Sequence, residues 1–577
     1  MKVSIAKTSG FCMGVRRAVD MVLDASNRYT EPIYTFGPLI HNPQVLRLLA
    51  EKKISVMETI PEQGNGIVLI RAHGVPPRTR EKLEAAGFTV IDATCPRVVK
   101  VQTIISRNAA EGCAVIIIGD KDHPEVVGLL GYAGDRGVVA DSLEALKALP
   151  AFEKAIIVAQ TTQSTRLFDE VGAWAAAHHP HYQVFNTICP STKNRQAETE
   201  ALARQTDAMV VVGGYNSGNT QRLAQVSKKS GHPVFHVETS EELDTNALAK
   251  SDHIGITAGA STPNWIIKKI YRELEAARFR SKGPLARTLF SAQRLLLLTN
   301  IYLAIGAGLL CYSASLLRQG EHFAPHILIA MLYIFSMHTL NRLTGIAEDH
   351  YNDPYRAAFY DKNMTVLALL AVGAGGLGLA VAFSLGVFPF LMLLVMSGLG
   401  LSYNLYLVPK GVTAIPFRRI KDIPGSKTLL ISAAWGVAVC AFPAAATDSL
   451  NFSSMFTALW LAGIVFVRSA FFDLIDMQGD RIAGKETLPV LMGADRALRF
   501  LKQMLAGLFL FLLAATLLGV VSSLGYLLLV LPVTGYMLLA LYQRDTLQSG
   551  LVLEFLVESQ FVLAGLLALT WTMMTAL

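Results

Sequence analysis

The sequence predicts two classes of structure in one chain: an α/β domain over residues 1–280 and an all-α membrane domain over residues 292–577. Two observations lead to this prediction. The first half alternates short apolar runs with charged helical stretches, whereas the second half consists mostly of long apolar segments. The 577 residues are 52% hydrophobic and 16% charged. Their mean hydropathy of +0.40 is too high for a purely soluble protein.

The strands of the first half are expected where short β-rich runs end in polar or glycine-containing phrases. Charged, helical stretches separate them, and this alternation is typical of α/β units with parallel strands. The runs are GIVLIRAHG, CAVIIIGD, AIIVAQTT, MVVVGGYN and HIGITAGAS.

The N-terminus, MKVSIAKTSG, predicts a short strand and a turn, and it has no apolar run of the kind found in signal peptides. We therefore expect the first half to lie in the cytoplasm, where its cysteines stay reduced and a disulfide framework does not form. The net charge of +7 does not indicate a nucleic-acid partner, because much of the excess lies beside the membrane segments. Residues 281–291 form one such basic juxtamembrane linker.

Nine segments of the second half approach the length needed to cross a bilayer. With residue 290 inside, the basic loops 278–294 and 408–427 both face the cytoplasm, as the positive-inside rule prefers. The chain is thus predicted to be a multi-pass protein of the cell (inner) membrane with a cytoplasmic N-terminal domain. The segments are 292–315, 325–341, 364–384, 387–407, 428–446, 456–472, 501–520, 524–542 and 553–575.

A glycine-rich run at 373–378, GAGGLG, has the spelling of a dinucleotide-binding loop. It lies within an apolar span and follows no strand, however. Small residues at a close crossing of two helices explain it better.

Three cysteines of the first half stand in distinctive phrases: Cys12 in SGFCMGVRRAV, Cys95 in IDATCPRVVKV and Cys189 in NTICPSTKNRQ. They lack the CxxC pairs that are usual in zinc sites. Each lies beside Gly, Pro or Thr at an expected strand end, which is where α/β folds place their sites. If they converge, the three thiols hold an iron–sulfur cluster by three corners and leave the fourth iron open to a substrate. A buried, inert cysteine is the alternative for each.

Three histidines stand in similar loop-like phrases: His41 in GPLIHNPQV, His73 in RAHGVPP and His123 in KDHPEVVG. Polar phrases such as AQTTQS, YNSGN and TAGAS end the neighbouring strands. Imidazoles, hydroxyls and amides together suit a diphosphate group, because they offer many donors and a phosphate favours the protonated imidazole. A single histidine of this kind is more often structural, but three in matching contexts favour a site.

Over residues 1–280 these phrases resemble the 4-hydroxy-3-methylbut-2-enyl diphosphate reductase family, which acts in the methylerythritol phosphate route to isoprenoids. The resemblance implies three α/β lobes around a 4Fe–4S cluster, with products isopentenyl and dimethylallyl diphosphate and a ferredoxin or flavodoxin as electron donor. It implies Glu125 as the proton source. The other implied residues are the cluster ligands Cys12, Cys95 and Cys189, and the substrate-binding residues His41, His73, His123, Thr161, Ser217, Gly218, Asn219 and Ser261.

Gly218 is the visible departure from that family. The family commonly has a second serine at this place in the phrase, so a hydroxyl donor is missing here. The backbone N–H can still serve, and we expect the change to affect substrate affinity rather than the chemistry.

The second half carries three acids in FFDLIDMQGDRIAGKETLPV: Asp473, Asp476 and Asp480. Their spacing of three and four residues places them on one face of a helix. Carboxylates at a membrane surface are costly unless they have a purpose, and a magnesium-bridged diphosphate supplies one. A solvated helix end is the alternative.

This phrase resembles the second aspartate motif of the UbiA family of membrane prenyltransferases, as does the stretch that contains Tyr403, Lys421 and Lys427. The family's first motif, N-D-x-x-D-x-x-x-D, reads NRLTGIAED here. Arg342 and Gly345 replace two acids, and only Asp349 keeps its register. Glu348 and Asp353 are nearby acids that can compensate. The implied Mg²⁺–diphosphate ligands are Asp349, Asp473, Asp476 and Asp480.

The sequence therefore favours a fusion of a reductase and a membrane prenyltransferase-like domain. Two rivals stay open. One is a membrane prenyltransferase with a regulatory iron–sulfur sensor; the other is a reductase with a non-catalytic membrane anchor. The complete set of cysteines, histidines and Glu125 argues against the regulatory sensor. The altered motif at 341–349 is consistent with a non-catalytic membrane anchor.

Overall fold

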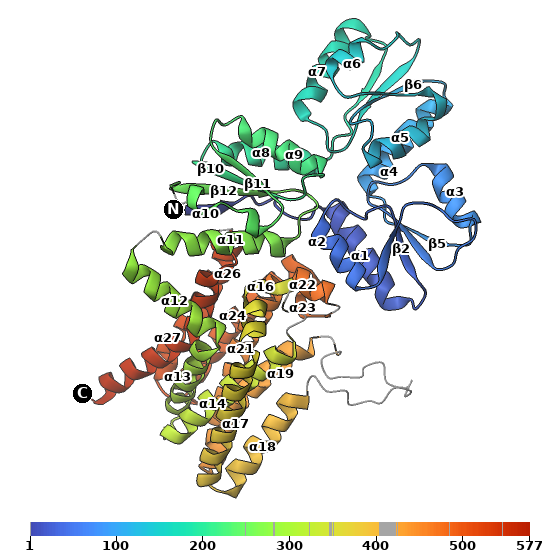
Figure 1. Cartoon of the computed structure of the whole chain (residues 1–577). Helices are drawn as coiled ribbons and strands as arrows, with labels where there is room; N and C mark the ends of the chain where they lie inside the picture. Colours follow the sequence, from blue (N-terminus) through green and yellow to red (C-terminus); the bar gives the residue numbers. More distant parts are fainter. Residues whose placement is uncertain are drawn as a thin grey trace. The chain divides into compact units, whose positions relative to one another are not determined.

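The computed structural model describes residues 2–248, 250–280, 283–321, 323–345, 349, 351–402, 423, 425–483, 485–544 and 546–576. It divides into two compact units, an N-terminal unit of Met1–Arg278 and a membrane unit of Phe279–Leu577 (Figure 1). The strands of the described chain all belong to the N-terminal unit, and the described part of the membrane unit is helical. The predicted classes, α/β and all-α, are confirmed.

The strands form three four-stranded sheets in which every pairing is parallel, and Figure 1 shows them as three lobes. The orders are β1-β12-β10-β11, β3-β2-β4-β5 and β7-β6-β8-β9. The strands are β1 (Lys2–Ile5), β2 (Ile33–Phe36), β3 (Ile54–Met57), β4 (Ile67–Ile70), β5 (Thr89–Asp92), β6 (Ala114–Ile118), β7 (Gly137–Ala140), β8 (Ala155–Ala159), β9 (Gln183–Phe185), β10 (Ala208–Val212), β11 (Val234–Val237) and β12 (His253–Ala258). The three-lobed arrangement is thus present.

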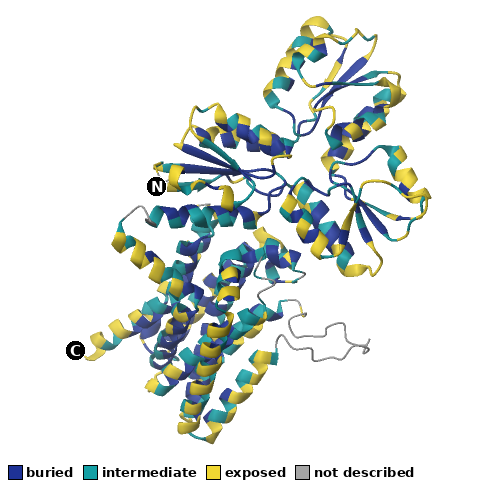
Figure 2. Ribbon diagram, in the orientation of Figure 1, coloured by how far each residue is buried: buried dark blue, intermediate teal, exposed yellow. Residues whose placement is uncertain are grey.

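The inner strands explain the apolar runs of the sequence. Strands β4, β8 and β10 are buried along their whole length, as Figure 2 shows in dark blue. Helices cover both faces of a parallel sheet, so its central strands read as continuous apolar runs instead of alternating ones. Strand β1 pairs with β12, with Lys2 opposite His253, so the first sheet joins the two ends of the unit.

Helices connect these strands, and several begin with proline, whose fixed φ and missing N–H suit the first helical turn. They are α1 (Met13–Arg28), α2 (Pro43–Glu51), α3 (Pro77–Ala85), α4 (Pro96–Ala110), α5 (Pro124–Ala133), α6 (Leu143–Lys147), α7 (Thr165–His178), α8 (Pro190–Ala203), α9 (Gly218–Lys228), α10 (Thr245–Leu248) and α11 (Asn264–Arg280), with 3₁₀ turns at Gly134–Arg136 and Ser240–Glu242.

Three helices lead the chain from one sheet to the next. Helix α1 follows edge strand β1 and precedes β2, α4 follows edge strand β5 and precedes β6, and α8 follows edge strand β9 and precedes β10. The three lobe-to-lobe crossings are therefore equivalent, and each begins where an edge strand ends.

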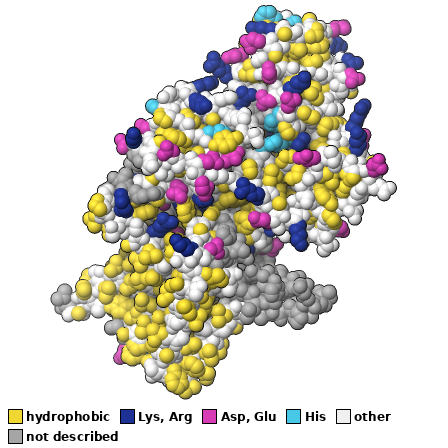
Figure 3. Space-filling view, in the orientation of Figure 1, with side chains coloured by type: hydrophobic (Ala, Val, Ile, Leu, Met, Phe, Trp, Pro, Cys, Tyr) yellow, Lys and Arg dark blue, Asp and Glu magenta, His cyan; other side chains and the backbone are white. Residues whose placement is uncertain are grey.

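The membrane unit exposes many large apolar side chains, which Figure 3 shows in yellow. Leu369 is 70% exposed and Leu518 is 78% exposed, as expected for helices that face lipid. The helices are α12 (Pro284–Leu298), α13 (Ile301–Leu317), α14 (Ala324–Thr344), α16 (Pro354–Lys362), α17 (Met364–Ser384), α18 (Val387–Ser402), α19 (Ser426–Gly436), α20 (Phe442–Ala446), α21 (Phe452–Ile475), α22 (Met477–Ile482), α23 (Leu488–Met492), α24 (Ala494–Leu517), α25 (Leu524–Leu528), α26 (Val530–Gln543) and α27 (Leu551–Ala576), with a π-helical turn at Val437–Ala441.

Within the described residues, seven helices or near-continuous helix pairs are long and apolar enough to span a membrane, which indicates a multi-pass membrane protein. The predicted first span, 292–315, is not one straight helix: α12 and α13 meet at a bend of 73°, beside Asn300 in the left-handed region. Counting this bent pair gives eight. The predicted span at 387–407 coincides with the shorter helix α18, and residues 403–407 lie outside the described chain. The count of nine stays a prediction.

The glycine run at 373–378 lies inside helix α17, which packs against α14. A methyl group added at Gly375 would lie 2.9 Å from the hydroxyl of Ser336 on α14, and one at Gly378 would touch Leu332. The run therefore permits close helix packing, as predicted from its place in an apolar span.

Candidate functional site

The three cysteines occupy the same structural position in three places. Cys12, Cys95 and Cys189 are the N-cap residues of α1, α4 and α8, the three helices that carry the chain between sheets. All three thiols are partly buried and free of disulfide bonds. The fourth cysteine of this unit, Cys113, is not an N-cap residue; it precedes β6 and packs against the core of that sheet.

The cysteines lie close together. A methyl group added at Gly14, on α1, would lie 2.5 Å from the Sγ atom of Cys95, so the first turn of α1 rests against that thiol. Burial raises the pKa of Cys95, backbone N–H groups of its own helix lower it, and negative charge on Cys12 and Cys189 raises it again. Negative charge on Cys12 and Cys189 thus opposes the deprotonation of Cys95 until a cation is present.

A 4Fe–4S cluster fits this donor set. Iron–sulfur clusters are held by cysteine thiolates, and three ligands leave one iron open. Three half-buried cysteines, each at the N-terminus of a helix, provide these ligands.

The three histidines meet in a compact group. The rings of His41, His73 and His123 lie 5.2 to 6.0 Å apart between centroids, and each offers a ring nitrogen within 4.8 Å of the others. Burial lowers the pKa of all three, and the charge of Arg71 lowers it further; for His123 the value is about 4. An anion would reverse this effect, because it favours protonated imidazole.

Several side-chain nitrogen atoms of this group have no hydrogen-bond partner among the described residues. They are Nε2 of His41, Nδ1 of His73 and Nδ2 of Asn219, all buried. Buried polar groups are normally satisfied, and one left unpaired costs about 1–3 kcal/mol. Such a set of unused nitrogens is suited to the oxygen atoms of a diphosphate.

The serine and glycine residues lie beside the same histidines. Ser261 donates to Ser217 Oγ at 3.4 Å and to the backbone oxygen of His41 at 3.3 Å. A methyl group added at Gly218 would lie 3.8 Å from the ring of His123, an ordinary contact. The structure therefore has room for a small side chain at position 218.

Glu125 is a buried carboxyl group next to this set. It is 1% exposed, and both of its oxygens accept hydrogen bonds from Thr161: one from the backbone N–H at 2.7 Å, the other from the hydroxyl at 2.8 Å. Burial raises the pKa of Glu125 to about 7, against the opposing effect of the Thr161 hydrogen bonds. A carboxyl group with such a pKa can hold and release a proton near neutral pH.

Backbone hydrogen bonds link each cysteine to one of the predicted substrate residues or its chain neighbour. The acceptors of the first two bonds directly precede Ser261 and His73. The bonds run from the N–H of Cys12 to Ala260 O (3.2 Å), from that of Cys95 to Ala72 O (2.9 Å) and from that of Cys189 to Thr161 O (2.9 Å). The backbone at each cysteine is thus tied to the backbone of a segment that carries a predicted substrate residue.

Two arginines of the site were not identified from the sequence. Arg71 is half-buried near the three histidines, and its Nε atom has no partner in the described structure. Arg195 is buried, donates to the backbone oxygens of Ala258 and Gly10, and interacts with the charges of Cys12 and Cys189. Arg71 lies in the same phrase as His73, and Arg195 lies in the same phrase as Cys189. These positions were the only signal in the sequence that could have identified the two arginines as site residues.

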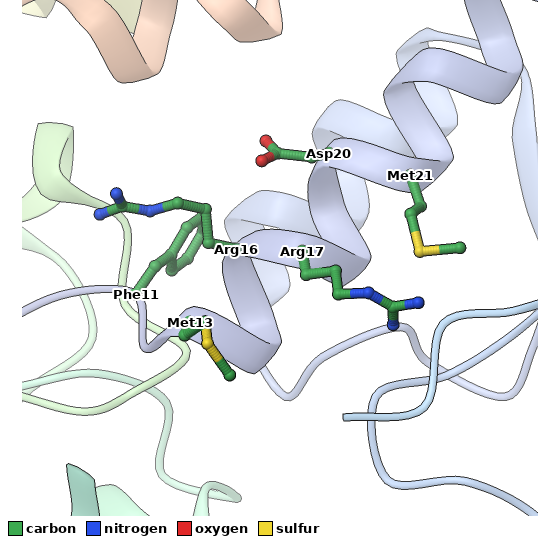
Figure 4. A pocket seen from close by; sticks show the side chains of 6 residues that line it. All are labelled: Phe11, Met13, Arg16, Arg17, Asp20 and Met21. Carbon is green, nitrogen blue, oxygen red and sulfur yellow. The ribbon is translucent and has the colours of Figure 1, made fainter. Parts of the chain in front are cut away.

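A pocket beside the first turns of α1 does not contain the predicted site residues (Figure 4). Met13, which follows Cys12 directly and is 62% exposed, is one of the side chains that line this pocket. The pocket is lined by Phe11, Met13, Arg16, Arg17, Asp20 and Met21.

The acids of the membrane unit are arranged differently from the prediction. The chain turns at Asp476, between α21 and α22, so the expected single helix is interrupted between Asp473 and Asp480. Asp473 accepts from Lys427 Nζ at 2.8 Å and from the hydroxyl of Thr428 at 2.6 Å. Both of its oxygens therefore already have partners.

The altered first motif also has an internal partner. Arg342 Nη1 lies 3.4 Å from Asp349 Oδ2, so an arginine stands against the one acid that keeps its register. Glu348, Tyr403 and Lys421 lie outside the described residues. As a set of Mg²⁺ ligands these acids fit poorly, because Asp349 and Asp473 are engaged by the basic side chains of Arg342 and Lys427.

The chain matches two family models: the LytB protein family over residues 3–275 and the UbiA prenyltransferase family over residues 301–552. A 4-hydroxy-3-methylbut-2-enyl diphosphate reductase from Geobacter sulfurreducens is 40% identical over 283 residues, which are 49% of this chain and 100% of the relative. Another from Oleidesulfovibrio alaskensis is 44% identical over 280 residues, 48% of this chain and 100% of the relative.

Solved structures similar to each half are known. A structure of (E)-4-hydroxy-3-methyl-but-2-enyl diphosphate reductase has 40% identity and a TM-score of 0.38, and covers 48% of this chain and 99% of that one. A UbiA homolog from Archaeoglobus fulgidus bound to GPP and Mg²⁺ has 14% identity and a TM-score of 0.36, and covers 48% of this chain and 99% of that one.

Proposed function

Since the chain belongs to the 4-hydroxy-3-methylbut-2-enyl diphosphate reductase (LytB) family through residues 3–275 and carries a UbiA domain over 301–552, we propose that its N-terminal unit catalyses this reduction. The substrate loses its allylic hydroxyl as water, and isopentenyl and dimethylallyl diphosphate are the products. We place this unit in the cytoplasm, on a multi-pass protein of the cell (inner) membrane.

One observation carries the proposal: the backbone bonds of the three cysteines lead directly to the polar groups a diphosphate substrate needs. Cys95 bonds to the neighbour of His73, Cys12 to the neighbour of Ser261, and Cys189 to Thr161. A sensor domain needs the thiols but has no use for the three histidines and the buried carboxyl group. The same anchoring supports a reductase over a sensor.

The substrate's diphosphate is held by the histidine group with Ser217, Asn219 and Ser261, and by the backbone N–H at Gly218. Protonation of the imidazoles on binding matches the negative charge of the diphosphate. When bound to the three thiolates, a 4Fe–4S cluster supplies single electrons and a Lewis-acidic iron.

Glu125 holds the proton, and Thr161 fixes its carboxyl group through two hydrogen bonds. The overall change uses two electrons and two protons: the carbon–oxygen bond breaks, water leaves with the hydroxyl oxygen, and a carbon–hydrogen bond forms. The electrons come from a ferredoxin or flavodoxin as external donor.

The test is anaerobic reduction of 4-hydroxy-3-methylbut-2-enyl diphosphate by the detergent-purified full chain, with a one-electron dye as donor. We expect turnover that is lost in Cys12→Ser, Cys95→Ser and Cys189→Ser, because each change removes a cluster ligand. A fully loaded cluster with no turnover of this substrate would contradict the reductase and favour the sensor.

For the membrane unit we propose a site for a prenyl diphosphate at the acids Asp349, Asp473, Asp476 and Asp480, with Mg²⁺ as the cation. Prenyl transfer to an acceptor stays a prediction. The ion pairs Arg342–Asp349 and Lys427–Asp473 favour a second candidate, in which this unit only binds a prenyl diphosphate and anchors the reductase.

A further inference from the structure

Two acids of the membrane unit are already neutralised by basic side chains of the chain itself. Arg342 is paired with Asp349 at 3.4 Å. Lys427 is paired with Asp473 at 2.8 Å, and Thr428 holds the second oxygen of that carboxylate. A metal ion at either acid would have to displace a cation that is already in place.

Asp480 is in a different situation, and it has a partner that the sequence did not reveal. Asn352, just before α16, donates its amide to Asp480 Oδ1 at 2.8 Å across a separation of 128 residues. Asp480 is fully buried and Asn352 is 8% exposed. Oδ2 of Asp480 and Oδ1 of Asn352 are left without a hydrogen-bond partner among the described residues.

These two oxygens are the right kind of ligand for a hard divalent cation. Mg²⁺ binds oxygen, and commonly takes only one or two carboxylates with water and substrate phosphate completing its coordination. Left unpaired and buried, a carboxylate oxygen carries a desolvation cost that a cation would remove. The oxygen of Asn352 also lies against Gly479, where an added methyl group would collide with it.

The charge balance points to one cation. Asp349, Asp473 and Asp480 carry three negative charges, and Arg342 and Lys427 carry two positive ones. Asp476 and Lys485 lie near Asp480 and add one charge of each sign. These seven side chains sum to one net negative charge, so a divalent ion at Asp480 leaves one net positive charge to meet the diphosphate anion.

We propose that the membrane unit binds one divalent cation, between Asn352 and Asp480, and that Arg342 stands in place of a second. This inference rests on the prenyl diphosphate site proposed above and adds a new ligand, Asn352. The site would then hold one metal ion. The positive charge of a second ion, which the altered first motif no longer binds, would be replaced by the guanidinium group of Arg342.

The experiment counts bound Mn²⁺ on the full chain, with its cluster loaded and diamagnetic, from the electron paramagnetic resonance signal of free Mn²⁺. Geranylgeranyl thiodiphosphate is present as a non-transferring probe. The histidine group of the N-terminal unit is a second place where Mn²⁺ can bind, so the result is a difference between variants. Asn352→Leu and Asp480→Asn should each lower the count by one, or weaken one ion at least about tenfold.

Arg342→Asp gives the opposite test, because it restores an acid and frees Asp349. The count should then rise by one above that of the wild type. Asp495→Asn, an exposed acid at the start of α24, is the matched control and should change nothing. Folding of each variant is checked by elution profile, cluster absorbance and melting temperature.

A wild-type count that is unchanged in Asn352→Leu and Asp480→Asn would overturn the proposal, as would an unchanged count in Arg342→Asp. Reductase turnover of the same wild-type preparation is measured in parallel. An active reductase without the expected Mn²⁺ difference overturns the cation site alone. Probe binding without any Mn²⁺ difference overturns the cation while leaving the prenyl diphosphate site in place.

Discussion

At the scale of single residues, Glu125 shows how burial creates a useful acid. An exposed glutamate is ionised at neutral pH and has no proton to give. Here burial disfavours the charge and raises the pKa to about 7, while the two hydrogen bonds from Thr161 keep the carboxyl group in one orientation. The same contacts therefore set both the position and the protonation of this group.

The pH profile of kcat/KM follows from this value. Glu125 is protonated below pH 7 and ionised above it, so kcat/KM should fall as pH rises through about 7. Thr161→Val removes a hydrogen bond that favours the ionised form, and the descending limb should move up by about 1 pH unit. Stopped-flow or dye-coupled assays from about pH 5.5 to 9, a range that brackets the pKa of about 7 for Glu125, measure the limb.

Glu125→Gln is the companion test. This variant should keep the absorbance of the cluster and lose about 100-fold or more in turnover, because it cannot give a proton. Normal turnover in this variant would show that the proton comes from another group, and a limb that persists unchanged would show the same.

The hydroxyl donor that is missing at Gly218 can be restored by substitution. Because an added Cβ makes only ordinary contact with His123, Gly218→Ser should fit and supply one more hydroxyl donor. A net hydrogen bond of about 0.5–1.5 kcal/mol predicts a KM two- to tenfold lower, roughly, with kcat little changed. Gly218→Ala adds the bulk without the donor and is the control; equal KM values for the two variants would contradict the role of the hydroxyl.

At the scale of elements, the proposed cluster site depends on three helix starts at three sheet crossings. The first turn of α1 approaches Cys95 so closely that only a glycine fits at position 14.

Buried ion pairs hold helices together in the membrane unit, where Arg356 is paired with Glu554 and Arg468 with Glu558. Charges in such places are costly unless they are paired, so these contacts define how α16 and α21 meet α27.

Gly14→Ala tests the contact between α1 and Cys95. The added methyl group should displace the thiol and lower the iron content per chain about twofold or more, since overpacking of this kind costs about 1–3 kcal/mol. Iron and protein assays after anaerobic reconstitution provide the measurement. Gly172→Ala, on α7 with open space around it, is the matched control and should bind iron normally; equal loss in both would mean a general effect of helix glycines.

Much of this element-level arrangement could be predicted from the sequence. Apolar runs that end in Cys, His or Thr phrases marked the carboxyl ends of parallel strands, which meet at one edge of a sheet. The bend at Asn300 could not be predicted, because it falls inside an apolar, helix-compatible stretch. The interruption at Asp476 could not be predicted either, because the spacing of the three acids fits one continuous helix. Packing against other helices, and not local sequence, decides where such a helix breaks.

At the scale of the whole molecule, the two units have separate cores and separate chemistry. Every residue proposed for the reductase site belongs to Met1–Arg278, which has its own three sheets. A domain with its own core can in principle fold alone. The reductase is therefore expected to depend on the membrane unit for location and not for catalysis.

A truncated chain of residues 1–280 tests this independence. With the dye as donor it should keep kcat within about threefold of the full chain, because no proposed catalytic group is removed. Iron content and melting temperature verify that the shorter chain folds. A loaded, folded fragment with no turnover would mean that the membrane unit contributes to the reaction itself.

The sequence by itself determined the two structural classes, the positions of the three cysteines and three histidines, and the altered motif of the membrane unit. These follow from periodicity, strand ends and residue chemistry, which are local properties. Only the tertiary structure decided which groups meet: Arg71 with the histidines, and Asn352 with Asp480 across 128 residues. Contacts between distant segments arise from packing and burial, and nothing in the neighbouring sequence specifies them.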